Sequence, residues 1–432
     1  MKLFCYIYFI WSTILFLFTL CSAEITINEY LSTAFYDESL VFQDEKIDFL
    51  KRSSSNTPFV NEIELRMNID EFEDSKQEYT VRFNMNGWGE HSHGKKVYDI
   101  SIKYNENERA LLLNKSLKER YMDVIRYYYL EMEFVFINSL IGIFTDRLKV
   151  IKNNVGTLQF DAIGLIETEG KLLDLQLDKV NNKNAQTVIE EKIQSFFPNK
   201  SDFIIQTKNL IDIYSIQEKV AQLKTTFKEK NVHIQTRQYQ YEMAQAKYLL
   251  EKAENNTYLS FFEAAYNMEQ KDKFEKAFTM EFGVKIPIVN PNQLDINRRM
   301  LRSIKAKSEW IQSNKKIQMR FHALSRKINR LITQYDIISI QKERSRTEKS
   351  LVIFQQMEGV NPLILLKLKQ SMLKNKMTMQ KIKYQIYETY ITLLDYSGKL
   401  VSNPLMNYLS EHSEPLNILN VSEKQKCDRY HY

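Results

Sequence analysis

The segment from Tyr79 to Met85 reads Tyr-Thr-Val-Arg-Phe-Asn-Met, so apolar and polar residues alternate one by one. Because successive side chains of a β-strand point to opposite faces, this pattern predicts a strand with one apolar and one polar face. The run from Ile63 to Ile69 alternates in the same way, and a charged connection separates the two runs. We therefore expect a β-hairpin over residues 62–86.

Glycine and proline are rare in this chain and unevenly placed. Gly87, Gly89 and Gly94 follow the predicted hairpin directly, which indicates a bend where strand gives way to helix. The 432 residues contain 10 Gly and 7 Pro in all, well under half of the usual share of about 7% and 5%. Few turns are then possible, which argues against sandwiches, propellers and many-looped α/β enzymes and favours long helices.

Long stretches with few or no glycines and prolines predict the helices. They cover residues 27–55, 95–150, 157–196, 207–254, 293–357 and a last stretch that ends at Gly398. A second strand pair is expected within about residues 258–288. Its second strand, from Phe278 to Ile288, alternates clearly, whereas the first, from Tyr258 to Met268, alternates weakly.

Matching landmarks recur in the chain at nearly one spacing. From Tyr79 to Phe278 there are 199 residues, and from Gly156 to Gly359, at the two predicted turns between helices, there are 203. The order helix, strand pair, long helix, turn and helix therefore occurs twice, which predicts an internal duplication. The predicted repeats cover residues 24–200 and 201–400, and a tail follows at 401–432.

Residues 1–23 have the pattern of a secretory signal peptide. Lys2 precedes an apolar run that ends at Leu20, and small residues stand just before Glu24. An uncleaved N-terminal anchor is the alternative. Removal of this segment leaves Cys427 as the single cysteine, so no disulfide framework is expected. No later run approaches 18 consecutive apolar residues, so we expect any membrane crossing of the mature chain to use β-strands.

Catalysis, cofactor binding and metal binding are not expected. The sequence has no phosphate-binding glycine loop, no nucleophile elbow and no metalloprotease motif. His91 and His93 are two potential metal ligands without an adjacent third, so a solvated bend is favoured over a metal site. The net charge of +6 is too mild and too dispersed to indicate a nucleic-acid partner.

The chain resembles the bacterial outer-membrane efflux proteins of the TolC family over about residues 25–400. The stretch Asn154-Val155-Gly156-Thr157, with Asp161 soon after it, is similar to the family's turn at the periplasmic tip. The stretch from Phe282 to Ile288 resembles the strand that leads through a proline into the second long helix. The stretch from Tyr384 to Leu400 resembles the family's final helix.

This resemblance implies a mainly α fold with a β-barrel portion. Four strands cannot close a barrel, and an open sheet edge is not stable in lipid. A homotrimer would therefore form a twelve-stranded outer-membrane β-barrel, continued by an α-helical barrel in the periplasm. The residues then expected to face lipid are Ile63, Leu65, Met67, Tyr79, Val81, Phe83, Phe278, Met280 and Phe282. Those expected to face the lumen are Glu64, Arg66, Arg82, Asn84 and Glu281.

The tip candidates implied by the resemblance are Asp161, Gly156, Gly359 and Asn361. The family's second tip turn often carries acidic residues, but here no acid follows Gly359 until beyond Lys369. An acidic ring from that repeat is therefore not expected, and Asp161 in the first repeat is the remaining candidate.

The implied function is that of a passive exit duct in the outer membrane of a Gram-negative bacterium. It would serve a tripartite efflux system or a type I secretion system, with a periplasmic adaptor, an inner-membrane pump and outer-membrane lipid as partners. The alternative is a secreted helical coiled-coil protein that binds partners without forming a channel. Period-2 runs at matching positions of both halves argue against it, because a coiled coil has no reason to be interrupted twice in this way.

Overall fold

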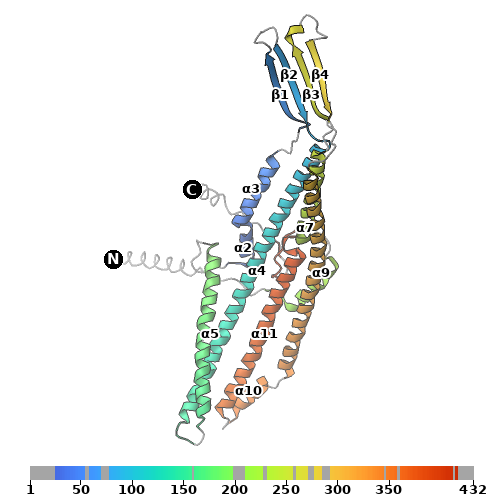
Figure 1. Cartoon of the computed structure of the whole chain (residues 1–432). Helices are drawn as coiled ribbons and strands as arrows, with labels where there is room; N and C mark the ends of the chain where they lie inside the picture. Colours follow the sequence, from blue (N-terminus) through green and yellow to red (C-terminus); the bar gives the residue numbers. More distant parts are fainter. Residues whose placement is uncertain are drawn as a thin grey trace, which may run out of the picture. The chain divides into compact units, whose positions relative to one another are not determined.

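The computed structural model describes residues 25–53, 58–69, 77–157, 160–197, 210–226, 231–255, 259–270, 277–284, 292–344, 347–357, 361–411 and 414–416. The predicted signal peptide at 1–23, Gly359, Cys427 and most of the predicted tail lie outside these residues. Within them, no helix has an apolar run of the length that crossing a membrane requires. Long helices and four strands make up two units (Figure 1). Unit 1 comprises residues 1–37, 113–229 and 319–432, and unit 2 comprises residues 38–112 and 230–318.

Unit 2 contains the β-sheet. Its strands are β1 (Val60–Ile69), β2 (Gln77–Met85), β3 (Leu259–Asn267) and β4 (Phe278–Val284). They lie in the order β1-β2-β3-β4, and every neighbouring pair is antiparallel. The two strand pairs lie where the alternation predicts them, and the β2–β3 pairing joins them although they are far apart in the sequence (Figure 1).

Four helical segments complete unit 2. They are α3 (Glu38–Arg52), the first part of α4 (Glu90–Asn153), α7 (Val232–Glu254) and the first part of α9 (Gln293–Arg344). A short η3 (Met268–Gln270) follows β3. Asn107 on α4 is buried, and its Nδ2 donates to Thr236 Oγ1 of α7 at 2.7 Å. Gln43 Nε2 of α3 donates to the Asn105 carbonyl of α4 at 3.0 Å. These buried polar side chains are satisfied across the helix contacts and fix their register.

The bend predicted after β2 is present, and it depends on a close approach of two backbone segments. A Cβ atom at Gly87 would lie 2.2 Å from the carbonyl oxygen of Ala253, near the end of α7. Because only glycine lacks that atom, a glycine is needed where the chain turns from β2 into α4.

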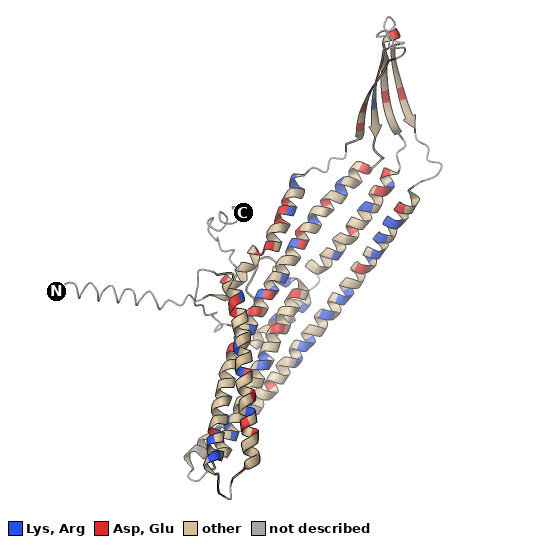
Figure 2. Cartoon of the chain, turned by 60° about the vertical axis from the view of Figure 1, so that its left-hand side comes forward, with Lys and Arg blue, Asp and Glu red and all other residues tan. Residues whose placement is uncertain are grey.

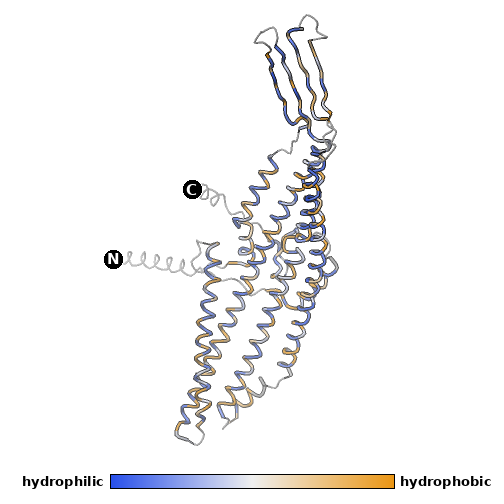
Figure 3. The backbone as a smooth tube through the Cα atoms, viewed as in Figure 1, coloured by the Kyte–Doolittle hydropathy of each residue, from blue (hydrophilic) through white to orange (hydrophobic). Residues whose placement is uncertain are grey.

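Unit 1 is helical. Its elements are α2 (Ile27–Ser32), η1 (Thr33–Tyr36), the second part of α4, α5 (Ala162–Gln194), α6 (Ile213–Thr226), the second part of α9, α10 (Thr347–Gln356), α11 (Pro362–Ser397) and η4 (Lys399–Val401). Apolar and polar segments alternate along these helices (Figure 3). Tyr121 of α4 is fully buried, and its hydroxyl donates to the Met406 carbonyl at 3.0 Å. The same hydroxyl accepts from the Tyr408 amide at 3.1 Å, so it ties the segment after η4 to the core.

Two predicted helices are divided in the structure. Residues 27–55 form α2, η1 and α3, since Asp37 is extended between them. The stretch 207–254 contains two helices, because Asn231 begins α7 as its N-cap and its Oδ1 accepts from the amides of His233 and Ile234 at 3.0 and 3.3 Å. An Asn that satisfies free amides in this way favours a new helix start over continuation. In the stretch 293–357, the described residues form α9 up to Arg344 and α10 from Thr347 to Gln356, and residues 345 and 346 lie outside the described residues.

Candidate functional site

The sheet of unit 2 has one apolar and one polar face, and the strand register decides which residues share each. Leu65 lies opposite Val81, which lies opposite Ala264, which in turn lies opposite Met280. The neighbouring rows are also apolar across the sheet. They are Ile63, Phe83, Phe262 and Phe282 on one side, and Met67, Tyr79, Tyr266 and Phe278 on the other. All nine residues predicted to face lipid therefore lie on one face, together with three residues of β3.

This apolar face is exposed in the single chain. The exposed fraction is 79% for Leu65, 60% for Met280 and 65% for Phe282. Aromatic rings run across it, since Phe83 and Phe262 have centroids 5.9 Å apart and Phe262 and Phe282 have centroids 5.2 Å apart. A contiguous exposed apolar surface of this kind marks contact with another protein or with lipid.

The opposite face carries the residues predicted to line the lumen. Arg82 forms an ion pair with Glu263, and its guanidinium lies over the Phe261 ring at 4.2 Å from the centroid. Asn84 Nδ2 donates to Glu64 Oε1 at 3.0 Å. Glu64 also pairs with Arg66, and Glu281 lies opposite Glu263 in the register. The face is thus a network of charged and amide groups held between neighbouring strands.

The sequence did not assign the side chains of β3. Phe261 and Phe262 are consecutive aromatic residues, so the alternation of apolar and polar residues is interrupted there. The strand register nevertheless puts their side chains on opposite faces. Glu263 was therefore missed as the partner of Arg82. Phe261 fits on the polar face because Gly283 lies opposite it, where a Cβ atom would stand 2.2 Å from the ring. The glycine in an otherwise alternating β4 was the available signal.

Both outer strands of the sheet have a free edge. β1 pairs with β2 alone and β4 with β3 alone among the described strands. These strands have 10 and 7 residues, so each edge presents a row of amide and carbonyl groups without a strand partner in this single chain.

Of the predicted tip residues, Gly156 lies in a turn between helices, and Asp161 and Asn361 lie at helix starts. Gly156 has a φ of 86° and lies in the turn between α4 and α5. Asp161 is exposed and is the N-cap of α5, where its Oδ1 accepts from the Gly164 amide at 2.8 Å. Asn361 is the N-cap of α11, and its Oδ1 accepts from the Leu363 amide at 2.9 Å. The structure therefore gives Asp161 and Asn361 the same local capping role, 200 residues apart.

Positive charge is concentrated on α9. This helix contains 13 Lys and Arg against four Asp and Glu, whereas α4, at the matching place in the chain, contains 11 against nine. Figure 2 shows blue residues all along the long helix that follows the last strand. Among the described residues, no group of three or more His, Cys, Asp or Glu is placed to hold a metal ion.

No family model and no curated protein matches this sequence. Solved structures do match it. The outer membrane protein VceC from Vibrio cholerae matches with a TM-score of 0.63 and 10% identity, over 86% of this chain and 96% of that one. The open state of the Neisseria gonorrhoeae MtrE outer membrane channel matches with a TM-score of 0.61 and 11% identity, over 89% and 90% of the two chains.

The Campylobacter jejuni CmeC outer membrane channel matches with a TM-score of 0.58 and 9% identity, over 93% of this chain and 88% of that one. These likenesses cover nearly the whole of each chain but few identical residues, so they concern the path of the backbone. They agree with the long helices and the four-stranded antiparallel sheet described above. The chain therefore has the fold of the TolC-type outer-membrane channels.

Proposed function

We propose that three copies of this chain form an outer-membrane exit duct, a channel through which solutes leave a Gram-negative cell passively. The observation that carries the proposal is the sheet of unit 2, which exposes apolar side chains of all four strands on one face and has two free edges. Such a face is stable against hydrocarbon, and such edges are stable in lipid only when they are paired. The fold shared with outer-membrane channels supports the same function.

In this proposal, three four-stranded sheets close one barrel of twelve strands. The apolar rows that contain Leu65, Phe83 and Phe278 face lipid. The polar face lines the lumen with Glu64, Arg66, Arg82, Asn84 and Glu281, to which the register adds Glu263. Ion pairs such as Arg82–Glu263 suit a water-filled interior, where polar side chains stay hydrated.

The helices continue this barrel as a tunnel across the periplasm. The turns before α5 and α11 form its tip, where a periplasmic adaptor and an inner-membrane pump meet the duct and the pump supplies the energy. We also propose that the chain is a duplicated unit, covering residues 24–200 and 201–400. In support, β1 and β3 begin at residues 60 and 259, and α5 and α11 begin at residues 162 and 362.

The test is conductance combined with cysteine labelling. The chain, with Cys427→Ser as background, is expressed in a Gram-negative host, extracted from the outer membrane in detergent and added to a planar bilayer. We expect a trimer that conducts ions. In Glu281→Cys, a charged, water-soluble thiol reagent should reach the lumen and reduce the conductance. In the matched variant Met280→Cys, one residue away on the opposite face, the same reagent should have no effect.

A water-soluble monomer without conductance would contradict the duct and favour the secreted coiled-coil alternative. Equal labelling of the two cysteines in a conducting trimer would contradict the assignment of the faces while leaving the channel intact.

A further inference from the structure

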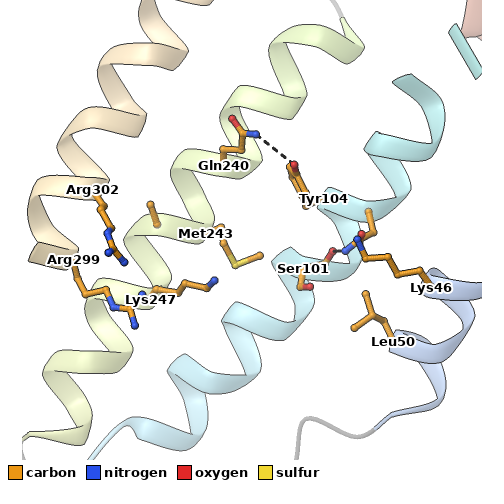
Figure 4. Close-up of a pocket in the computed structure, with 11 residues that line it drawn as sticks. Lys46, Leu50, Ser101, Tyr104, Gln240, Met243, Lys247, Arg299 and Arg302 are labelled. Carbon is orange, nitrogen blue, oxygen red and sulfur yellow. Dashed lines mark hydrogen bonds between the residues drawn. The ribbon is translucent and has the colours of Figure 1, made fainter. Parts of the chain in front are cut away.

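A groove of about 490 Å³ lies within unit 2, on side chains of α3, α4, α7 and α9 (Figure 4). Leu50 of α3 and Met243 and Ala244 of α7 give it an apolar lining. Cavities that bind small organic molecules have volumes of roughly 300–1,000 Å³ and a mainly apolar lining with a few polar groups. The groove thus has the size and the lining of a ligand site.

The charged groups at this groove all have one sign. Lys46, Lys247, Arg299 and Arg302 line it, and no Asp or Glu of the described residues does. Arg299 Nε lies 3.4 Å from Glu251 Oε2, which offsets part of its charge. For the other three cations, the described part of the chain supplies no ion pair. Figure 4 shows Lys247, Arg299 and Arg302 gathered at one side of the groove and Lys46 at the other.

The middle of the groove is held by hydrogen bonds between helices. Gln240 Nε2 of α7 donates to Tyr104 Oη of α4 at 3.4 Å (Figure 4). The Tyr104 hydroxyl in turn donates to Glu108. Beneath them, Asn105 is buried, and its Oδ1 accepts from Gln43 Nε2 of α3 at 3.1 Å. Side chains on packed helices with satisfied polar partners keep their positions, so the groove is formed before any ligand arrives.

We propose that this groove binds an amphipathic organic anion. The apolar body of the ligand lies on Leu50 and Met243, and its carboxylate, sulfonate or phosphate group lies against Lys247 and Arg302. Guanidinium groups form charge-assisted, often bidentate hydrogen bonds with such oxyanions. The inference goes beyond the exit duct, because it concerns binding at the helical wall and holds whether or not the chain conducts.

The test measures binding without transport. The full chain is titrated with 8-anilinonaphthalene-1-sulfonate in phosphatidylcholine nanodiscs, with empty nanodiscs as blank, or in buffer alone if it purifies as a water-soluble protein. N-phenyl-1-naphthylamine, which has the same rings but no sulfonate, is the matched probe. We expect the sulfonate to bind about tenfold tighter or more, since charged hydrogen bonds contribute about 1.5–3 kcal/mol.

The variants locate the binding. Lys247→Gln combined with Arg302→Gln should weaken sulfonate binding about tenfold or more. Lys307 is exposed on α9, the helix of Arg302, but lies outside the groove, so Lys307→Gln should leave sulfonate binding unchanged. Ala244→Trp should abolish binding by filling the groove while every charge is retained. Far-UV circular dichroism verifies that each variant is folded.

Equal affinity for the two probes would overturn the proposal. So would unchanged binding in the folded double variant, or a folded Ala244→Trp protein that binds as the wild type does. Anionic phosphatidylglycerol in the nanodisc separates two sources of the ligand. Competition with the sulfonate supports the proposal with a lipid headgroup as ligand, and unchanged binding supports it with a soluble anion as ligand. None of these results depends on conductance, so failure of the duct proposal is recognised separately.

Discussion

The row of side chains formed by Leu65, Val81, Ala264 and Met280 crosses the middle of the apolar face and yields the sharpest prediction about the sheet. Met280 is 60% exposed in the single chain and stands in the row that lies midway along β1, β2 and β3. If this face meets lipid, Met280→Arg puts a charge near the bilayer midplane, which costs about 2–4 kcal/mol in transmembrane barrels. That cost corresponds to an insertion equilibrium about 30- to 900-fold less favourable for each chain.

Two matched variants separate burial in lipid from other effects of a new arginine. Thr279→Arg puts the same charge one residue away, on the polar face beside Glu281, and should cost less than about 1 kcal/mol. Val284→Arg lies at the end of β4, where the cost in a barrel falls to about 0–1 kcal/mol near the interface. We therefore expect membrane insertion to be severely impaired in Met280→Arg but not in Thr279→Arg or Val284→Arg.

The assay is reversible insertion from urea into phosphatidylcholine vesicles, with protection of the sheet from trypsin as the measure of the inserted fraction. Far-UV circular dichroism of the urea-free samples shows whether the helices have formed. If Met280→Arg and Thr279→Arg insert equally well, the apolar face does not meet lipid, and the argument from the register is refuted.

Three further predictions concern particular side chains. Gly283→Val should displace the Phe261 ring, because a Cβ atom at this position would lie 2.2 Å from that ring. We expect a loss of about 1–3 kcal/mol in the insertion assay. The additional substitution Phe261→Ala should relieve most of this loss, and an unchanged loss would contradict the contact. Asp161→Ala should lower stability by about 1 kcal/mol in thermal unfolding because it removes the cap of α5. Asp161→Asn keeps an acceptor and should be nearly neutral for stability, so changed ion selectivity in Asp161→Asn would be the mark of an acid in the pore. Burial, with nearby Glu190 as a second cause, raises the pKa of Glu131, so its ionised form destabilises the fold above that pKa. Glu131→Gln should raise the free energy of unfolding at pH 7 by less than about 1 kcal/mol, seen as a higher melting temperature, and the gain should vanish below the ordinary pKa of 4.5. A gain that is independent of pH would contradict this.

Local patterns were sufficient for the strands and for the bend after them. The alternation in β1, β2 and β4 depends on side-chain direction within one strand, which is a property of the backbone and needs no partner. Gly87 indicated a bend because glycine adopts backbone conformations that other residues rarely do. The reason that this bend needs a glycine, however, is the nearby carbonyl of Ala253 in α7. The recurrence of landmarks near 200 residues was likewise readable, because spacing is a property of the sequence.

The ends of the helices and the faces on which the β3 side chains lie were harder to predict from the sequence. Asn231 begins α7 within what was predicted as one helical stretch, because an Asn inside a helical pattern carries no mark that it will accept amides as a cap. The faces of Phe261 and Phe262 became clear only when β3 was paired with β2 and β4. Asp161 was singled out as a pore candidate from resemblance, and its role in capping α5 appeared only with the backbone around it.

The sequence by itself determined where most helices and the two strand pairs lie and which residues of β1, β2 and β4 share a face, since these follow from periodicities of about 3.6 and 2. Tertiary structure decided what those faces meet. It paired Arg82 with Glu263, 181 residues away, and it brought Lys46, Lys247 and Arg302 to one groove from three helices. Such juxtapositions depend on how helices and strands pack against one another, and no local pattern along the chain encodes them.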